Sequence, residues 1–288
     1  MVKVAELLAA GRTMSFEFFP PRSDEAERAL EKAVGELAPL EPSFVSVTYG
    51  ALGSTKERTR EVVIRMNAEQ AFPCVAHLTC VGHTRSDLVA LLDEYAANGV
   101  ENILALGGDP PADGSDPGGD FTYASELVEL VRAHPGGFGV GVAAHPEVHP
   151  RSSDRSGDRE RLARKLQDAD YGITQFFFDV ADYVRMVDEL EALGCTTPVI
   201  PSVMPLINVA GVRRMAGMNG SKIPAHLEAE LDRRADDPDA VVALGVEVAT
   251  QLCSELLEAG VPGVHLYAMN RSASLRQIYA NLGLHRGR

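Results

Sequence analysis

Eight short runs rich in β-branched and aromatic residues alternate along this chain with segments of helical periodicity. The runs cover residues 13–19, 44–49, 74–80, 102–106, 138–144, 172–178, 198–204 and 263–269. Helical periodicity is clearest in residues 25–37, 57–69, 86–97 and 181–193. Strands separated by helices pair in parallel, because a helical crossover returns the chain in the same direction. Eight such units predict an α/β fold, a (β/α)8 TIM barrel, with a doubly wound open sheet as the alternative.

The open sheet is the weaker alternative because no G-x-G-x-x-G sequence follows the first predicted strand. One domain, 1–288, is predicted, since a single barrel commonly fills such a length. Residues 113–120 and 219–239 look like loop or short-helical insertions, and neither resembles an interdomain linker. Residues 1–12 favour a short amphipathic N-terminal helix over a secretory signal.

Several predicted helices begin with a recognisable cap. Ser54-x-x-Glu57 and Thr84-x-x-Asp87 match the capping box, in which each end satisfies a backbone N–H of the other. Asp237 precedes a proline that needs no N–H partner, which favours a helix beginning there. These signals support the helical half of the repeating unit.

Composition narrows the classes of partner and the cellular location that this chain could have. The chain has 41 acidic and 27 basic residues, a formal net charge of −14, which disfavours binding to nucleic acid or to anionic membranes. Its 4 cysteines have no C-x-x-C spacing and are expected to be buried thiols in a reducing compartment. No apolar run is long enough for a transmembrane helix, and the best candidate, 240–257, is interrupted by charged residues. A cytoplasmic protein is therefore predicted.

Polar residues gather where the predicted strands end, which is the active-site face of a barrel. These residues are Glu17, Thr48, His77, Asp109, the segment 145–149, Gln175, Asp179 and Tyr267. Glu17 and Gln175 are the clearest candidates, because both lie between phenylalanines. A carboxylate in such surroundings is costly unless it is paired, and burial favours the protonated form that a general acid needs.

Each candidate also has a structural interpretation. Glu17 could cap a neighbouring loop, and Gln175 could be a hydrogen-bonded residue of a barrel layer. A single histidine such as His77 is more often a satisfied core residue than a ligand. Asp109 stands in a Gly-Asp-Pro sequence that is typical of turns.

His145 and His149 have the i, i+4 spacing of a helical metal site. Prolines at positions 146 and 150 argue against that helix, so a loop is favoured and no metal site is predicted. The chain also has no Walker-type phosphate loop and no G-x-S-x-G nucleophile elbow.

Seven motifs in a fixed order carry a family resemblance. They are SFEFFPPR at 15–22, VTYGALGS at 47–54, AHLTC at 76–80, LALGGDPP at 104–111, VAAHPEVHP at 142–150, ITQFFFD at 173–179 and LYAMNR at 266–271. From about residue 11 to residue 284 the chain resembles the short bacterial 5,10-methylenetetrahydrofolate reductases. The resemblance implies a (β/α)8 barrel that reduces 5,10-methylenetetrahydrofolate to 5-methyltetrahydrofolate with NAD(P)H, usually through FAD.

The resemblance also assigns roles on the substrate side. Glu17 matches the general acid that protonates N10 of the folate and opens the five-membered ring. Asp109 and Gln175 match contacts to the pterin, and Asp109 could also stabilise a developing cation. Tyr267 and Arg271 match positions near the aminobenzoyl-glutamate part of the substrate.

The cofactor positions implied by the resemblance are Thr48, His77, Gly108, Asp109, His145, His149, Asp158, Arg164 and Lys165. Three residues depart from the family pattern. Gly107 stands where the family has arginine, and His145 stands where an aromatic residue is common. Val209 replaces an aromatic residue near the nicotinamide or folate. The first two departures affect flavin contacts, so direct hydride transfer from NADH or NADPH stays open beside FAD.

The sequence therefore predicts an oxidoreductase that binds a reduced folate and a nicotinamide dinucleotide, and it leaves a homo-oligomer open. Two alternatives remain. One is a metal-dependent hydrolase barrel that uses His77, Asp109, His145 and His149. The other is a folate-binding paralogue without catalytic activity.

Overall fold

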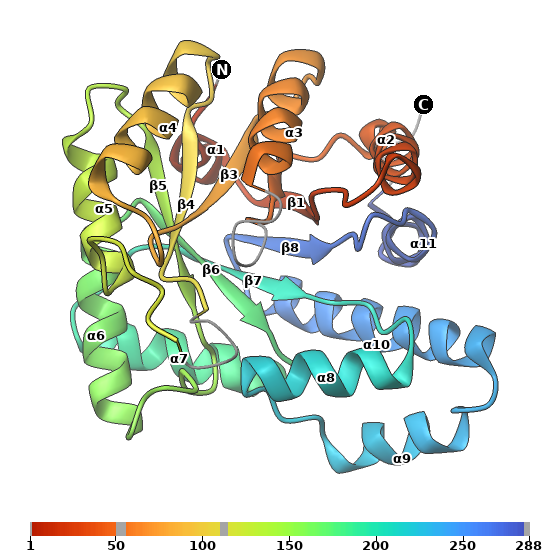
Figure 1. Cartoon of the computed structure of the whole chain (residues 1–288). Coiled ribbons are helices and arrows are strands. Elements are labelled where there is room, and N and C mark those ends of the chain that lie inside the picture. Colours follow the sequence, from red (N-terminus) through yellow and green to blue (C-terminus); the bar gives the residue numbers. More distant parts are fainter. Residues whose placement is uncertain (1, 50–55, 110–114, 285–288) are drawn as a thin grey trace.

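A computed structural model describes residues 2–49, 56–109 and 115–284 of the chain. Its centre is a closed barrel of eight parallel strands in sequential order, β1 to β8, with β8 pairing back onto β1 (Figure 1). The strands are β1 (Thr13–Phe18), β2 (Phe44–Val47), β3 (Cys74–Thr79), β4 (Asn102–Leu106), β5 (Gly139–Ala144), β6 (Tyr171–Phe176), β7 (Val199–Val203) and β8 (Gly263–Tyr267). The predicted barrel is confirmed, and the open sheet is wrong because β1 and β8 have no free edge.

Helices surround the strands (Figure 1). They are α1 (Val4–Ala10), α2 (Asp24–Leu37), the 3-10 helix η1 (Ala38–Leu40), α3 (Lys56–Glu69), α4 (Arg85–Ala97), α5 (Ala124–Ala133), α6 (Arg155–Gln167), α7 (Val180–Ala192), α8 (Val209–Asn219), α9 (Ala225–Arg233), α10 (Pro238–Glu258) and α11 (Ala273–Asn281). The capping box at Thr84 and the start of α10 after Asp237 are confirmed. Ser54 lies outside the described residues.

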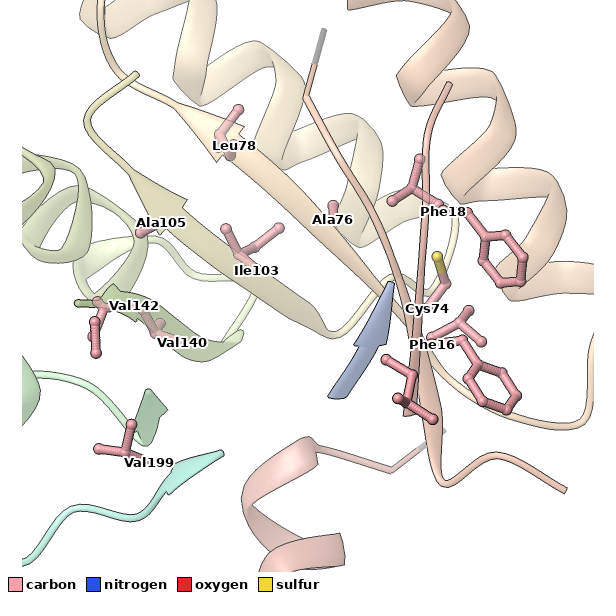
Figure 2. Packing of buried hydrophobic residues seen from close by; sticks show 14 of the residues in the cluster. Phe16, Phe18, Cys74, Ala76, Leu78, Ile103, Ala105, Val140, Val142 and Val199 are labelled. Carbon is pink, nitrogen blue, oxygen red and sulfur yellow. The ribbon is translucent and has the colours of Figure 1, made fainter. Parts of the chain in front are cut away.

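The main apolar core lies between the strands and the helices. Phe16 and Phe18 on β1, and Ala76 and Leu78 on β3, belong to this buried cluster (Figure 2). Neighbouring residues on each strand point to opposite faces, so the residues between them point into the barrel. The four cysteines are buried free thiols, as predicted.

A smaller apolar cluster fills the interior of the barrel at the end where the strands begin. It includes Phe44, Val75, Leu104 and Ile200, and α1 contributes the buried Val4. Asn102, at the start of β4, accepts a hydrogen bond from the Val4 N–H at 2.9 Å and donates to the Val2 carbonyl at 3.2 Å. The N-terminal helix therefore closes this end of the barrel.

The insertion at 219–239 contains α9, which confirms a short helix there. The helix that follows, α10, is long and apolar enough to pass a length-and-composition test for a membrane span, the one such helix among the described residues. Its side chains Val241, Leu252 and Leu256 are buried, and α10 packs against β7, β8 and α11. These contacts are those of a core helix of the barrel.

Candidate active site

Four polar side chains meet at the carboxyl ends of the strands, where barrel enzymes carry their active sites. Glu17 comes from β1, His77 from β3, Gln175 from β6 and Tyr267 from β8. The strand register places Glu17 beside Tyr267. The sequence predicted all four as site residues, and the fold brings them together across four strands that are distant in sequence.

Glu17 is the acidic group of this cluster, and it is only 5% exposed. Its Oε2 atom lies 3.6 Å from Nε2 of His77 and 3.5 Å from Nε2 of His265. One carboxylate oxygen thus faces two imidazoles, while Phe16 and Phe18 beside it in the sequence point into the outer core. The arrangement suits a buried carboxyl group that exchanges a proton with a ligand.

His265 was not predicted from the sequence. It is completely buried on β8, and its Nδ1 is hydrogen-bonded to Ser15 Oγ at 2.7 Å and its Nε2 to Ser46 Oγ at 3.1 Å. Its ring stacks on Phe44, with 5.7 Å between the ring centres. A signal was available, because His265 precedes Tyr267 by two residues and must therefore point into the barrel as well.

His77 is a neutral imidazole at the mouth of the barrel. Burial lowers its pKa to about 4, although the nearby Glu17 acts in the opposite direction. Its Nε2 is buried and has no hydrogen-bond partner within the part of the chain that is described. A buried ring nitrogen without a partner is costly, so this atom is suited to meeting a polar atom of a ligand.

Gln175 and Tyr267 form the other side of the cluster. The Tyr267 hydroxyl donates to Gln175 Oε1 at 3.5 Å, and the tyrosine ring packs edge-on against Phe176. Burial, with the Glu17 charge adding to it, raises the pKa of Tyr267 well above its usual value. The hydroxyl therefore stays protonated and holds the Gln175 carbonyl oxygen, which orients the amide group.

The segment after β5 carries two more histidines of the predicted site. It is a loop, as the prolines predicted, yet the His145 and His149 rings contact each other with centres 4.5 Å apart. Burial lowers the pKa of His145 to about 3, and nearby cationic groups add to the effect. Lys165 on α6 donates to the Ala143 carbonyl at 2.7 Å, and burial lowers its pKa to about 8. The loop is therefore lined by neutral imidazoles beside an anchored lysine.

The remaining predicted positions are more dispersed. Asp109 and Arg271 are exposed, and Thr48 follows β2 and is partly buried. Gly108 has a φ of 87°, and a Cβ atom there would lie 2.4 Å from Val81 Cγ1, so only glycine fits. Arg164 has a 72% exposed side chain and pairs with Glu160 on its own helix, so the fold does not bring it to the cluster.

No group of three or more His, Cys, Asp or Glu side chains that could hold a metal ion occurs in residues 2–49, 56–109 and 115–284.

A family model described as methylenetetrahydrofolate reductase matches residues 3–283. The chain belongs to the methylenetetrahydrofolate reductase family.

Relatives of known name agree with the family. The chain is 35% identical over 275 residues to 5,10-methylenetetrahydrofolate reductase of Escherichia coli K12, covering 95% of this chain and 92% of that protein. It is 36% identical over 298 residues to methylenetetrahydrofolate reductase (NADH) 1 of Zea mays, covering 98% of this chain. The chain spans about half the length of the plant relatives that it matches, 50% in the maize protein.

Solved structures agree on the fold. An uncharacterised protein from Clostridium thermocellum, described as binding two copies of 5-methyl-5,6,7,8-tetrahydrofolic acid, superposes with a TM-score of 0.64. The two chains are 15% identical, and the match covers 97% of each. At this identity the likeness supports the barrel fold alone.

The family resemblance also implied FAD, and the positions that would hold it can be inspected. Gly107 offers no side chain, and the Arg164 side chain is exposed on the outside of α6. Asp158 is buried in an ion pair of 2.8 Å with Arg159, and Lys165 is bound to a backbone carbonyl. Gly107 and Arg164 therefore offer no contact for a flavin diphosphate here, whereas Lys165 and the Arg151 side chain, which lies beside Gly107, remain close to the loop that carries His145 and His149.

Proposed function

We propose that this protein reduces 5,10-methylenetetrahydrofolate to 5-methyltetrahydrofolate with NADH or NADPH. The observation that carries the proposal is the buried Glu17 between two imidazoles, beside the Gln175–Tyr267 pair, at the mouth of the barrel. The E. coli and maize relatives bear the name of this reaction, and the maize name includes NADH. Cytoplasmic location is part of the proposal, because the four cysteines are buried thiols.

In the first step Glu17 gives its proton to N10 of the folate. The bond between N10 and the bridging methylene carbon breaks, and its electron pair goes to N10, which leaves an iminium cation at N5. Protonation makes the amine a better leaving group, which is the ordinary contribution of a general acid. The site keeps water from Glu17, since the carboxyl group is only 5% exposed.

In the second step a hydride passes from C4 of the dihydronicotinamide to the iminium carbon. The carbon becomes the methyl group on N5, and the nicotinamide is oxidised to its cation. The transfer requires only that the two carbons lie in near-attack geometry. No step passes through a flavin, in keeping with the two expected flavin contacts that Gly107 and the exposed Arg164 do not provide. Asp109, at the rim, supplies negative charge that favours the cation.

The folate is recognised from the β6 and β8 side of the mouth. The Gln175 amide, held by Tyr267, can pair with the pterin edge, which presents both hydrogen-bond donors and acceptors. Asp109, which follows β4 on the opposite side of the mouth, adds a carboxylate acceptor for the pterin N–H groups. Arg271 is exposed just after β8, where its guanidinium can meet the glutamate carboxylates of the substrate.

The nicotinamide dinucleotide binds at the remaining side of the mouth, which is formed by the ends of β2 to β5. Thr48, His77, Gly108, His145 and His149 lie at these ends. His77 contributes a buried ring nitrogen that lacks a hydrogen-bond partner among the described residues. Neutral imidazoles suit an uncharged dihydronicotinamide better than charged groups would, because they impose no desolvation cost for a charge.

The test is an absorption spectrum of the purified protein followed by an assay with NADH and 5,10-methylenetetrahydrofolate. We expect colourless protein, folate-dependent NADH oxidation and 5-methyltetrahydrofolate as product, without added FAD. Visible flavin absorbance, or activity only after FAD is added, would overturn direct transfer and leave the reductase assignment intact. Folate binding without turnover would identify a binding paralogue, and stoichiometric zinc with hydrolytic activity would identify a hydrolase.

A further inference from the structure

A buried arginine lies under the loop that carries His145 and His149. Arg159 is 2% exposed on α6, and its guanidinium donates to three consecutive backbone carbonyls of that loop. Nη1 contacts the His145 carbonyl at 3.1 Å, and Nη2 contacts those of Pro146 and Glu147 at 2.5 and 2.7 Å. The backbone of the loop is therefore held by a side chain from the next helix.

The same guanidinium is held from behind by two carboxylates. Its Nη1 also donates to Asp158 at 2.8 Å, and its Nε donates to Glu189 on α7 at 2.8 Å. These five contacts match the five N–H donors of a guanidinium. Arg155 shares Glu189 at 2.6 and 2.9 Å and adds a bond of 2.9 Å to the Glu147 carbonyl. Arg155, Arg159 and Glu189, which we call the clamp, thus link α6, α7 and the loop.

The backbone carbonyls of residues 145–147 accept hydrogen bonds from Arg155 and Arg159 of α6, and farther along the loop the His149 carbonyl accepts one from the Ser152 N–H at 2.8 Å. Pro146 and Pro150 have no N–H to donate, and residues 145–150 belong to no helix or strand. Buried carbonyls without partners are costly, so their acceptance of guanidinium bonds sets the path of the chain. That path in turn fixes the contact of 4.5 Å between the His145 and His149 rings.

We propose that Arg159 is a positioning residue for the nicotinamide side of the site, acting through the backbone of the segment that presents His145 and His149. The inference rests on the proposed function. It predicts that a substitution of Arg159 weakens the binding of the nicotinamide dinucleotide more than the binding of the folate, because the contacts of Arg159 are with the loop after β5. Gln175 and Tyr267, which face the folate, belong to β6 and β8.

The test uses Arg159→Lys, which keeps a positive charge beside Asp158 but loses the planar fork of donors. Glu189→Gln is a second variant that loosens the guanidinium without removing it. Arg185→Lys is the matched control, because Arg185 on α7 is 53% exposed and pairs with Asp182 of its own helix. Each protein is assayed for the KM of NADH, the dissociation constant of 5-methyltetrahydrofolate, and hydrogen–deuterium exchange of peptides spanning 145–153.

For Arg159→Lys we expect the KM for NADH to rise about tenfold, from loss of the bidentate donors, with folate affinity changed less than about twofold. Exchange in 145–153 should become faster, Glu189→Gln should shift both readouts in the same direction, and the control should match the wild type. Unchanged exchange and KM, or equal losses for both ligands, would overturn the inference. If the wild-type protein shows no reductase turnover, the proposed function fails, and exchange and ligand binding still test the clamp.

Discussion

The two ends of the barrel interior are lined by different kinds of side chain, although the same strands build both. On β2 the inward residue Phe44 is apolar and Ser46 is polar; on β3 Val75 is apolar and His77 is polar. One step of two residues along a strand therefore leads from an apolar layer, closed by α1, to the layer that holds Glu17.

This difference separates the residues that stabilise the fold from the residues that take part in the proposed chemistry. The apolar end excludes water and gains free energy from burial. The polar end carries buried groups that do not make all their possible hydrogen bonds, such as the His77 Nε2 atom, which has no hydrogen-bond partner in the described chain. A rigid apolar floor beneath the polar layer fixes its side chains and strengthens their electrostatic interactions by keeping water out. Substitutions in the two layers should therefore change different measurements.

The largest expected effect is at Glu17. Replacing it in Glu17→Gln removes the transferable proton and should lower kcat by about a hundredfold or more, the usual scale for a general acid. Binding of 5-methyltetrahydrofolate should survive, because the amide has nearly the shape of the acid. Steady-state kinetics and calorimetry measure the two quantities, with the exposed Glu258→Gln as control. Near-normal turnover would make Glu17 a structural residue.

The next largest effect is expected at Leu104, where a substitution should change the free energy of unfolding and leave turnover unchanged. Leu104 is 3% exposed in the apolar layer, and Leu104→Ala should lower the free energy of unfolding by about 2–5 kcal/mol through lost burial and a cavity. Its kcat, measured well below the melting temperature, should stay near the wild-type value. Leu193→Ala is the control, since Leu193 is 43% exposed. A strong loss of kcat in Leu104→Ala would show that the two layers are not separable.

A smaller effect is expected for substrate recognition. Gln175→Ala should weaken folate binding by about 1–3 kcal/mol, because a buried polar group of the pterin loses its partner. Binding of the nicotinamide dinucleotide should change little. Calorimetric titration of both ligands distinguishes them, and the exposed Gln251→Ala serves as control. Equal losses for the two ligands would indicate a disturbed barrel layer rather than a lost pterin contact.

The last prediction concerns the dependence of stability on pH. The pKa of His145 is lowered from 6.5 to about 3 in the folded protein, so protonation favours the unfolded chain. The wild type should lose stability relative to His145→Gln as the pH falls below 6.5 toward 3, and the two should keep a constant difference above 6.5. Melting temperatures of both proteins at several pH values measure this. A difference that does not vary with pH would mean that His145 is not held in its neutral form.

The fold was predictable from the sequence because each parallel β/α unit repeats the same pattern. All eight strands were located, with ends displaced by at most two residues; the run at 44–49, for example, ends as a strand at Val47. The closure of the barrel end by α1 was not predicted. It depends on Asn102, whose side chain bonds the backbone of residues 2 and 4, and no local pattern marks such a distant contact.

The residues that meet in the candidate site were predicted in part for the same reason. Glu17, Gln175 and Tyr267 could be found because each is a polar residue in an apolar strand. His265 was missed because its partners, Ser15 and Ser46, are distant in sequence and look unremarkable there. Arg159 was missed because an arginine on a charged helix is usually exposed, and only the fold shows that it is buried.

The most direct test of the account is to follow the hydride itself. NADH carrying deuterium at the reactive C4 position is mixed with the purified protein and 5,10-methylenetetrahydrofolate in ordinary water, and the product is analysed by mass spectrometry. Direct transfer predicts deuterium in the methyl group of 5-methyltetrahydrofolate. Loss of the label to solvent would contradict the account, because a hydride that passes through a reduced flavin exchanges with water before it reaches the folate.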